Sequence, residues 1–264
     1  MSRIENKFAN LKAQNKKALI TFITAGDPDA QKSMDVMKQL PDNGADLIEI
    51  GMPFTDPMAD GPAIQASSLR ALANGMDMKG VLQMVRDFRT ENNETPIILM
   101  GYFNPVYQYG CTTFVIEAKE AGVDGLIIVD LPPEEDSELR QPAQEAGLDF
   151  IKLLTPTTKG VRLKKVLENA SGFLYYVSIT GVTGTKSADI NAVGQHIANI
   201  KLETDLPVVV GFGIKTPGDA ANMSKIADGV VVGSAIVDNM LENQDNTDMP
   251  AIISEQVQSL KQAI

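Results

Sequence analysis

Short apolar runs rich in β-branched residues recur along the whole chain. Eight of them are continuously apolar rather than alternating, which is typical of parallel strands buried on both faces. They predict strands at residues 19–24, 46–51, 96–101, 124–130, 149–155, 173–178, 207–213 and 228–234. An aspartate stands just before or at the start of four of these runs: Asp46, Asp124, Asp149 and Asp228.

Segments with the helical period of apolar positions lie between the predicted strands. Clear examples are residues 30–40, 81–90, 112–122, 134–147 and 161–171. Asp27-Pro28 and Thr216-Pro217 each predict a helix start, because an N-cap residue is followed by proline at the first helical position. Three glycines that precede strands predict left-handed helix ends: Gly44, Gly122 and Gly147.

The order of these elements predicts the fold class. Eight strand-helix units in about 250 residues indicate a closed (β/α)8 barrel, with residues 1–264 as one domain. An open doubly wound sheet is the alternative, but its phosphate fingerprint G-x-G-x-x-G is missing after the first strand, which continues into AGDPDA. An extra helix at about 2–13 is expected to close the barrel bottom, and a last helix is expected near 250–263.

Composition narrows the class of ligand. The 264 residues are 44% apolar, which is enough for a large core. A net charge of −11 disfavours nucleic acid and anionic lipid, and no apolar run approaches the roughly 18 residues of a membrane helix. Cys111 is the single cysteine, and the first residues lack the apolar core of a secretory signal. We therefore expect a cytoplasmic protein with a small-molecule ligand.

Glu49 interrupts the second predicted strand, between Ile48 and Ile50, where packing favours an apolar residue. Catalytic groups of (β/α)8 barrels lie at the carboxyl ends of strands, which is where Glu49 stands. Burial raises the pKa of a carboxyl group toward neutrality, which suits a residue that both gives and takes a proton. The alternative is an ion pair with a lysine of a neighbouring strand, and the spacing does not decide between the two.

Other polar residues are expected at the same end of the barrel. Asp60 lies in the loop that follows the second strand, where an aspartate often bonds only its own backbone. Tyr175 in the sixth strand fits a core position as well as a catalytic one. Lys152 in the fifth strand could form a Schiff base with a carbonyl substrate. The only histidine, His196, lies in a helix-like stretch and is expected to be structural, so acid–base chemistry is left to carboxylates, lysine or tyrosine.

Glycines gather after the last three predicted strands, in the segments TGVTGT (180–185), GFGIKTPG (211–218) and GSAIV (233–237). Glycine lets backbone N–H groups approach an anion closely, and a short helix starting at Ser234 would direct its positive end to the same place. Barrels of this class commonly bind phosphate after strands seven and eight. The pattern predicts a phosphate site, although each glycine alone is also compatible with a simple turn.

Several longer motifs occur in a fixed order along nearly the whole chain. They are EIGMPFTDPMADGP, YFNPVYQYG, DLPPEE, YYVSITGVTG, GFGI and GSAIV. In sequence and order they resemble the alpha subunit family of tryptophan synthase. The resemblance implies a barrel enzyme that cleaves indole-3-glycerol phosphate to indole and glyceraldehyde 3-phosphate, by a retro-aldol reaction without metal or cofactor.

The resemblance also implies roles for individual residues. Glu49 matches the acid–base residue, Asp60 the carboxylate that binds the ring N–H, and Tyr175 a tyrosine beside the substrate. Thr183 matches a loop residue that reaches Asp60 when the loop closes. The positions that match apolar neighbours of the indole are Phe22, Met100, Ile127 and Phe212, and those that match the phosphate site are Gly184, Gly213, Gly233 and Ser234.

The family's partner is a beta subunit that carries pyridoxal phosphate and receives indole through a tunnel, so the resemblance implies an alpha2beta2 complex. The residues that match its contact surface are Pro53, Asp56, Asn104 and Pro105. Two positions differ from many family members: Thr55 replaces Ser, and Ile179 replaces Arg. A stand-alone indole-releasing lyase and a barrel kept only to regulate the beta subunit remain alternatives, which indole release with and without that subunit separates.

Overall fold

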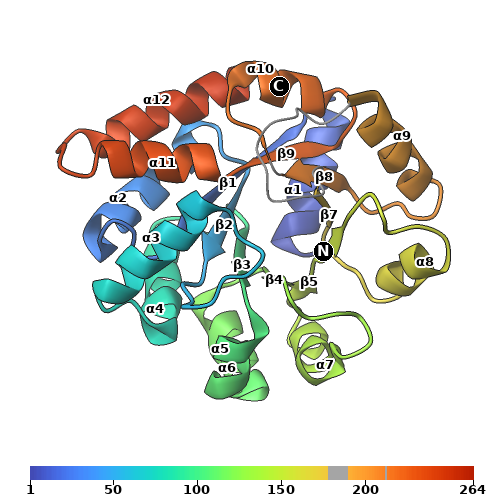
Figure 1. Ribbon diagram of the computed structural model, residues 1–264, viewed down its shortest axis with the longest axis horizontal. Helices are drawn as coiled ribbons and strands as arrows, with labels where there is room; N and C mark the ends of the chain where they lie inside the picture. The colour runs from blue at the N-terminus through green and yellow to red at the C-terminus, as the bar shows by residue number, and fades with distance from the viewer. Residues whose placement is uncertain (178–189, 212) are drawn as a thin grey trace.

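The computed structural model describes residues 1–177, 190–211 and 213–264. In these ranges nine parallel strands form a nearly closed barrel surrounded by helices (Figure 1). The strands are β1 (Ala18–Thr24), β2 (Leu47–Gly51), β3 (Ile97–Gly101), β4 (Gly125–Ile128), β5 (Asp149–Phe150), β6 (Lys152–Leu154), β7 (Leu174–Val177), β8 (Val208–Gly211) and β9 (Gly229–Val232). The predicted (β/α)8 barrel is confirmed, and the open sheet is wrong.

The fifth predicted strand consists of two short pieces. Among the described residues β5 pairs with β4 alone and β6 with β7 alone, so the sheet begins at β5 and ends at β6. The N–H of Ile151 still donates to the carbonyl of Leu126 at 3.0 Å. Beyond that bond, no backbone hydrogen bond joins β4 to β6 in the described part of the chain. We call this opening between the carboxyl-end halves of β4 and β6 the seam.

Helices cover the outer face of the barrel, as Figure 1 shows. The α-helices in the described ranges are α1 (Arg3–Ala13), α2 (Ala30–Gln39), α3 (Pro62–Ala73), α4 (Met78–Arg89), α5 (Phe103–Tyr109), α6 (Cys111–Ala121), α7 (Ser137–Glu145), α8 (Val161–Leu167), α9 (Ile190–Lys201), α10 (Pro217–Ser224), α11 (Ser234–Glu242) and α12 (Met249–Gln262). None of these helices is long and apolar enough to cross a membrane.

One predicted helix start is confirmed and one is wrong. Thr216 caps α10 with a reciprocal pair of hydrogen bonds to Asp219, as its position before a proline predicts. Asp27 does not cap α2, because the cap is Asp29, whose carboxylate accepts from the N–H of Lys32 at 2.8 Å. Asp27 instead binds the guanidinium of Arg70 through both carboxylate oxygens, at 2.7 and 2.9 Å.

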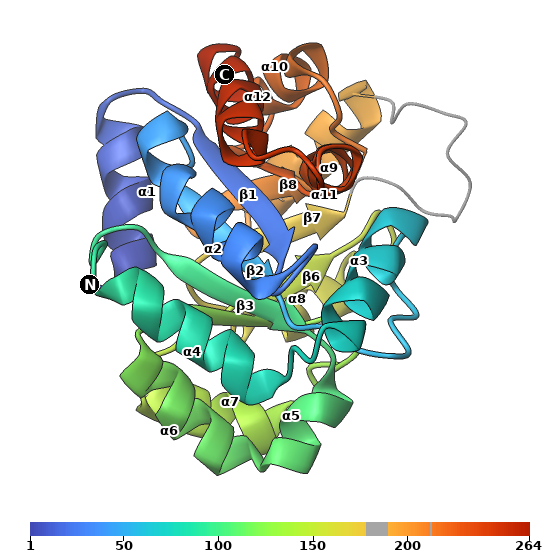
Figure 2. The ribbon, with the colours of Figure 1, turned by 90° about the vertical axis from the view of Figure 1, so that its left-hand side faces the viewer.

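The N-terminal helix fills one end of the barrel, as the sequence predicts. Ile4, Phe8 and Leu11 of α1 are buried in the same cluster as the inward-facing strand residues, and the rings of Phe8 and Phe173 lie 5.6 Å apart. Figure 2 shows α1 at the end of the barrel opposite the loop between β2 and α3. Because α1 closes the amino ends of the strands, a ligand enters from the carboxyl ends.

The aspartates before the strands connect neighbours in the barrel wall. The carboxylates of Asp46, Asp124 and Asp228 accept from the first free N–H of the adjacent strand, at 2.8 to 2.9 Å. Asp124 also binds Arg3 of α1 at 2.8 Å and Arg89 of α4 at 2.7 Å. Three of the four repeated aspartates thus join neighbouring strands at the amino end of the barrel, whereas the carboxylate of Asp149 accepts from the Ser2 hydroxyl at 2.7 Å.

The C-terminal helix closes the ring of helices beside the first strand. α12 packs against α2, and the ammonium of Lys261 binds the carboxylate of Asp46 at 2.7 Å. The same ammonium donates to the carbonyl of Lys17 at 2.9 Å. Contacts separated by more than 200 positions in the sequence therefore hold the first strand-helix unit in place.

Candidate active site

Glu49 points into the barrel because side chains alternate along β2. Ile48 and Ile50 pack outward against helices, whereas Leu47 and Glu49 face the interior. Glu49 is 0% exposed, and neither of its carboxyl oxygens has a hydrogen-bond partner among the described residues. Burial raises the pKa of Glu49 to about 8. The carboxyl group is therefore protonated at neutral pH, and the alternative of an ion pair with a lysine does not apply.

Asp60 lies in the loop after β2 and faces the same cavity. Burial raises the pKa of Asp60 to about 6, and a hydrogen bond from the Tyr102 hydroxyl opposes that rise. The same hydroxyl accepts from the N–H of Ala59 at 3.0 Å, so Tyr102 holds both the side chain of Asp60 and the backbone of the residue before it. Asp60 is mostly ionised at pH 7 while Glu49 is mostly neutral, which gives two carboxyl groups of one cavity opposite protonation states.

Tyr102 is a site residue that the sequence analysis did not single out. It precedes α5 directly after β3, it is 3% exposed, and its ring lies 5.5 Å from that of Phe54. Its place at the carboxyl end of a strand, in the motif YFNPVYQYG, was the available signal. The bond to Asp60 joins the end of one strand to the loop after another, which periodicity does not reveal.

A cavity of about 680 Å³ opens at the carboxyl ends of the strands. Besides Glu49 and Asp60, the predicted site residues that line it are Phe22, Met100, Tyr175, Gly213, Gly233 and Ser234. Ile127 does not line it, because it is fully buried in the interior cluster, and Ile128 and Val129 do so instead. Three predicted residues, Thr183, Gly184 and Phe212, lie outside the described residues, as does Ile179.

Tyr175 stands inside the barrel near both carboxyl groups. It is 9% exposed, and burial together with the charges of Glu49 and Asp60 raises the pKa of Tyr175 well above its ordinary value. A Cβ atom on Gly211, on the neighbouring strand, would lie 2.0 Å from the Tyr175 hydroxyl oxygen. Glycine at 211 thus makes room for the tyrosine, and the hydroxyl stays protonated and available as a donor.

The predicted anion site has two of its three loops in the described ranges. Gly213 follows β8 with a φ of +80°, a backbone conformation that favours glycine. Gly233 and Ser234 follow β9, and α11 starts at Ser234 with its free N–H groups at the cavity wall. The loop 180–185 lies outside the described residues. The two described loops can donate backbone hydrogen bonds to an anion in the cavity.

Lys152 is engaged in a buried ion pair. Its ammonium donates to the carboxylate of Asp136 and lies 4.3 Å from the centroid of the Phe150 ring. Arg140 binds the same carboxylate at 2.8 Å. Burial lowers the pKa of Lys152, and the bond to Asp136 opposes that change. A Schiff base at Lys152 would require this pair to break and leave Asp136 with Arg140 alone.

His196 is not among the described residues that line the cavity. His196 lies on α9, where its ring is 6.3 Å from that of Tyr176, in agreement with the structural role expected from the sequence. In residues 1–177, 190–211 and 213–264 no three His, Cys, Asp or Glu side chains are grouped so that they could hold a metal ion.

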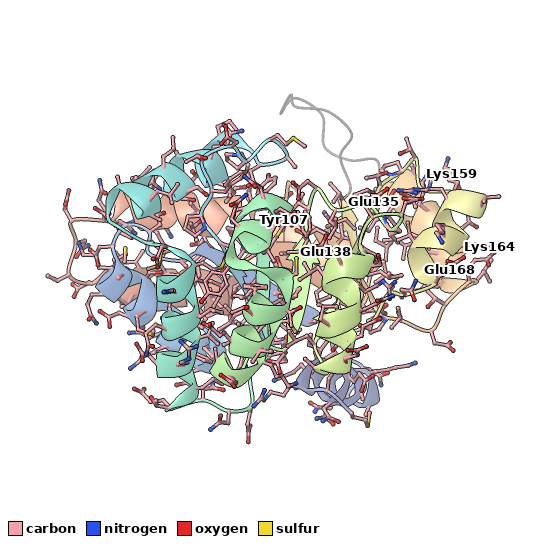
Figure 3. The ribbon with its side chains drawn as sticks, turned by 90° about the horizontal axis from the view of Figure 1, so that it is seen from below. Tyr107, Glu135, Glu138, Lys159, Lys164 and Glu168 are labelled. Carbon is pink, nitrogen blue, oxygen red and sulfur yellow. The ribbon has the colours of Figure 1, made fainter. Side chains whose placement is uncertain are left out.

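The predicted partner surface borders the cavity. Asp56 and Asn104 are exposed, whereas Pro53 and Pro105 are half-buried. Two large apolar side chains lie in the same segments: Met58 is 80% exposed and Tyr107, labelled in Figure 3, is 52% exposed.

These features define a (β/α)8-barrel enzyme with a buried carboxyl group and glycine-containing loops around one cavity at the carboxyl ends of its strands. The chain belongs to the tryptophan synthase alpha chain family, whose family model matches residues 8–264. It is therefore a lyase-type subunit of tryptophan biosynthesis.

Solved structures agree with the family assignment. Tryptophan synthase subunit alpha from Legionella pneumophila str. Paris is 42% identical, with a TM-score of 0.93 over 100% of this chain and 98% of that chain. Tryptophan synthase from M. tuberculosis, in an aminoacrylate-bound form, is 31% identical, with a TM-score of 0.89 over 100% of both chains.

Proposed function

We propose that the protein cleaves indole-3-glycerol phosphate to indole and glyceraldehyde 3-phosphate, with Glu49 and Asp60 as its catalytic residues. The observation that carries the proposal is the fully buried carboxyl group of Glu49, which has no partner among the described residues. It faces the same cavity as an ionisable Asp60 and the glycine loops after β8 and β9. Buried polar groups normally have a hydrogen-bond partner, so a free one in a cavity indicates that a ligand supplies it.

The reaction needs a proton on the ring before the carbon–carbon bond can break. Indole is a poor carbanion leaving group, so Glu49 first protonates ring carbon 3, which bears the side chain. The pKa of about 8 keeps that proton on Glu49 at neutral pH. The ring becomes a cation with its charge at the nitrogen, and the ionised Asp60 stabilises that charge by accepting the ring N–H.

The second step uses the carboxylate that the first step leaves. Glu49 takes the proton from the side-chain hydroxyl next to the ring, the carbon–carbon bond breaks, and its electron pair restores the neutral indole. The hydroxyl carbon becomes the aldehyde of glyceraldehyde 3-phosphate. Glu49 ends protonated, so one residue serves as acid and then as base, and no other reactant is consumed.

The remaining residues hold the substrate. Gly213, Gly233 and Ser234 bind its phosphate through backbone N–H groups. Phe22 and Met100 cover the faces of the indole ring, and the Tyr175 hydroxyl lies within reach of the reacting groups. The substrate contacts that the family resemblance implies for four further residues remain predictions; these residues are Ile127, Thr183, Gly184 and Phe212.

We further propose that a beta subunit of tryptophan synthase takes up the indole. Pro53, Asp56, Asn104 and Pro105 contact it, and the exposed side chains of Met58 and Tyr107 extend the same surface. Pyridoxal phosphate belongs to that subunit, and this chain needs no cofactor of its own for the retro-aldol step. The alpha2beta2 stoichiometry, the single domain and the cytoplasmic location stay predictions from the sequence.

An indole-release assay, with and without a beta subunit, tests the function. Glu49→Gln and Asp60→Asn are each expected to reduce the rate by about 10²- to 10⁴-fold, the usual contribution of a positioned acid or base. Both variants should still bind the phosphate substrate in a calorimeter, because the glycine loops are unchanged. A Glu49→Gln enzyme at nearly the full rate would overturn the mechanism.

A further inference from the structure

The ligand cavity continues beyond the residues that the proposed function uses. It extends into the seam, where its walls are Leu131 and Pro133 from the loop after β4 and Thr155 and Thr157 from the loop after β6. These side chains line the same cavity as Glu49 and Asp60. In the described ranges β4 and β6 share no backbone hydrogen bonds on the carboxyl-end side of Ile151. Side chains rather than backbone therefore form the wall there.

Two ion pairs cross the seam. Lys152 of β6 binds Asp136, and Arg162 of α8 binds Glu134, so each pair joins the β6 side to the β4 side. The first pair is buried and the second is about half exposed, at 46% and 47%. Glu135 and Lys159, labelled in Figure 3, mark the two loops that face the solvent at this place.

The position of the seam follows from the order of the strands. In the ring, β4 is four steps from β9 through β1, β2 and β3, and also four steps through β8, β7 and the joined β5 and β6. β9 and β4 accordingly lie on opposite sides of the barrel centre in Figure 1. A substrate whose phosphate is bound at Gly233 and Ser234 therefore extends its far end toward β4 and the seam.

We infer that the seam is a specificity pocket for substituents on the benzo ring of the substrate, so that the enzyme cleaves indole-3-glycerol phosphates bearing a small group at ring carbon 5 or 6. This inference rests on the proposed function, which places ring carbon 3 beside Glu49. Carbons 5 and 6 form the edge of the ring farthest from that carbon. Lys152 and Arg162 also line this part of the cavity, but their charges are paired with Asp136 and Glu134, so a wall of apolar side chains and threonine hydroxyls is left to contact a methyl, halogen or hydroxyl group.

The test compares substituted and unsubstituted substrates in two matched variants. Thr157 lines the cavity and is exposed, whereas Lys159 is exposed on the same loop and does not line it. Thr157→Phe fills the pocket, and Lys159→Phe adds the same side chain outside it. The measured quantity is the ratio of kcat/KM for 5-chloro- or 6-chloro-indole-3-glycerol phosphate to kcat/KM for the unsubstituted substrate.

We expect a wild-type ratio within tenfold of unity for at least one chloro isomer. Thr157→Phe should lower that ratio at least tenfold and leave the unsubstituted substrate unchanged, and Lys159→Phe should change neither. Leu131→Phe fills the pocket from the opposite wall and provides the same test if Thr157→Phe does not fold. A wild type that rejects both isomers, or a ratio that no pocket variant alters, would overturn the inference.

Binding separates this inference from the proposed function. The propyl phosphate analogues of the same indoles lack the side-chain hydroxyls and cannot be cleaved. Calorimetry should show that Thr157→Phe weakens the chloro analogue at least tenfold and spares the unsubstituted one. Absence of cleavage of the unsubstituted substrate would refute the proposed function, whereas cleavage of it with equal losses for both analogues would refute only the pocket.

Discussion

The two ends of the barrel hold buried carboxyl groups in opposite ways. At the amino end, Asp124 is 5% exposed and binds Arg3, Arg89 and the N–H of Ile97. At the carboxyl end, Glu49 is 0% exposed and has no partner among the described residues. Asp124 stabilises the fold through its hydrogen bonds. Glu49 lowers the stability of the fold because it is buried without a partner, but it can bind a ligand. In (β/α)8 barrels the amino end usually serves stability and the carboxyl end serves function.

The largest effect is expected at the satisfied end. Asp124→Ala leaves Arg89 as an uncompensated buried cation and frees the N–H of Ile97, so the free energy of unfolding should fall by about 3–5 kcal/mol. Asp228 holds the N–H of Val208 in the same way but is 32% exposed, so Asp228→Ala should cost less. Urea denaturation measures both. If both variants lose the same free energy of unfolding, burial of the aspartate does not determine how much it stabilises the barrel.

At the carboxyl end, replacing the buried Glu49 is expected to raise the free energy of unfolding above about pH 5, not to lower it. The pKa of Glu49 is about 8 in the folded protein and 4.5 for a glutamate in water, so between these values the folded state holds a proton that the unfolded state has lost. The contribution of Glu49 to wild-type stability should therefore fall as pH rises through this window, by about 1.4 kcal/mol per unit. Glu49→Gln has no such proton, so its stability relative to wild type should grow by roughly 3 kcal/mol from about pH 5 to pH 7.

Denaturation of both proteins across this pH range measures the difference. Asp60→Asn serves as the comparison, because the pKa of Asp60 is raised only to about 6 and its contribution must level off above that pH. Parallel stability curves for wild type and Glu49→Gln would contradict the assignment of a buried neutral acid.

The smallest effect concerns the residue that positions Asp60. Tyr102→Phe removes the hydroxyl that bonds Asp60 and Ala59, so kcat/KM should fall by about tenfold or less, the equivalent of one hydrogen bond. The hydroxyl lowers the pKa of Asp60, so its loss should move the acidic limb of the pH–rate profile, near pH 6 in the wild type, to higher pH. Tyr109→Phe is the control, because it also removes a hydroxyl that donates to a carboxylate, that of Glu117 at 2.6 Å, and Tyr109 does not line the cavity. An unmoved acidic limb would show that Tyr102 acts only on folding.

The sequence predicted the order of strands and helices because each unit carries local signals, such as continuous apolar runs and glycine helix ends. It also drew attention to Glu49 as a carboxyl group in an apolar strand, but the choice between a free acid and an ion pair with a lysine needed the structure. It failed where distant contacts decide. Asp27 loses its expected cap role to the ion pair with Arg70, and the continuous run at 149–155 gives no sign that pairing changes from β4 to β7 at Ile151.

In the candidate site too, the sequence predicted the residues that lie on strands but not those whose position depends on a loop or a strand end. Phe22, Met100 and Tyr175 meet at one cavity because their strands were placed correctly. Ile127 misses the cavity wall, and Ile128 and Val129 line it instead, which motif matching does not resolve at the end of a short strand. Tyr102 could not be assigned to Asp60 from spacing, because a loop conformation brings the two together.

The ion pair between Lys261 and Asp46 joins the last helix of the chain to its first strand-helix unit, so that unit is complete only when the whole chain has been made. The first strand-helix unit is synthesised early, but Lys261, which pairs with Asp46, is among the last residues to be added. Until α12 leaves the ribosome, the wall beside β1 lacks its outer cover, and its apolar residues stay open to wrong partners. A chain that stops before Met249 would therefore contain Glu49, Asp60 and the cavity around them and still lack the helix that packs on α2.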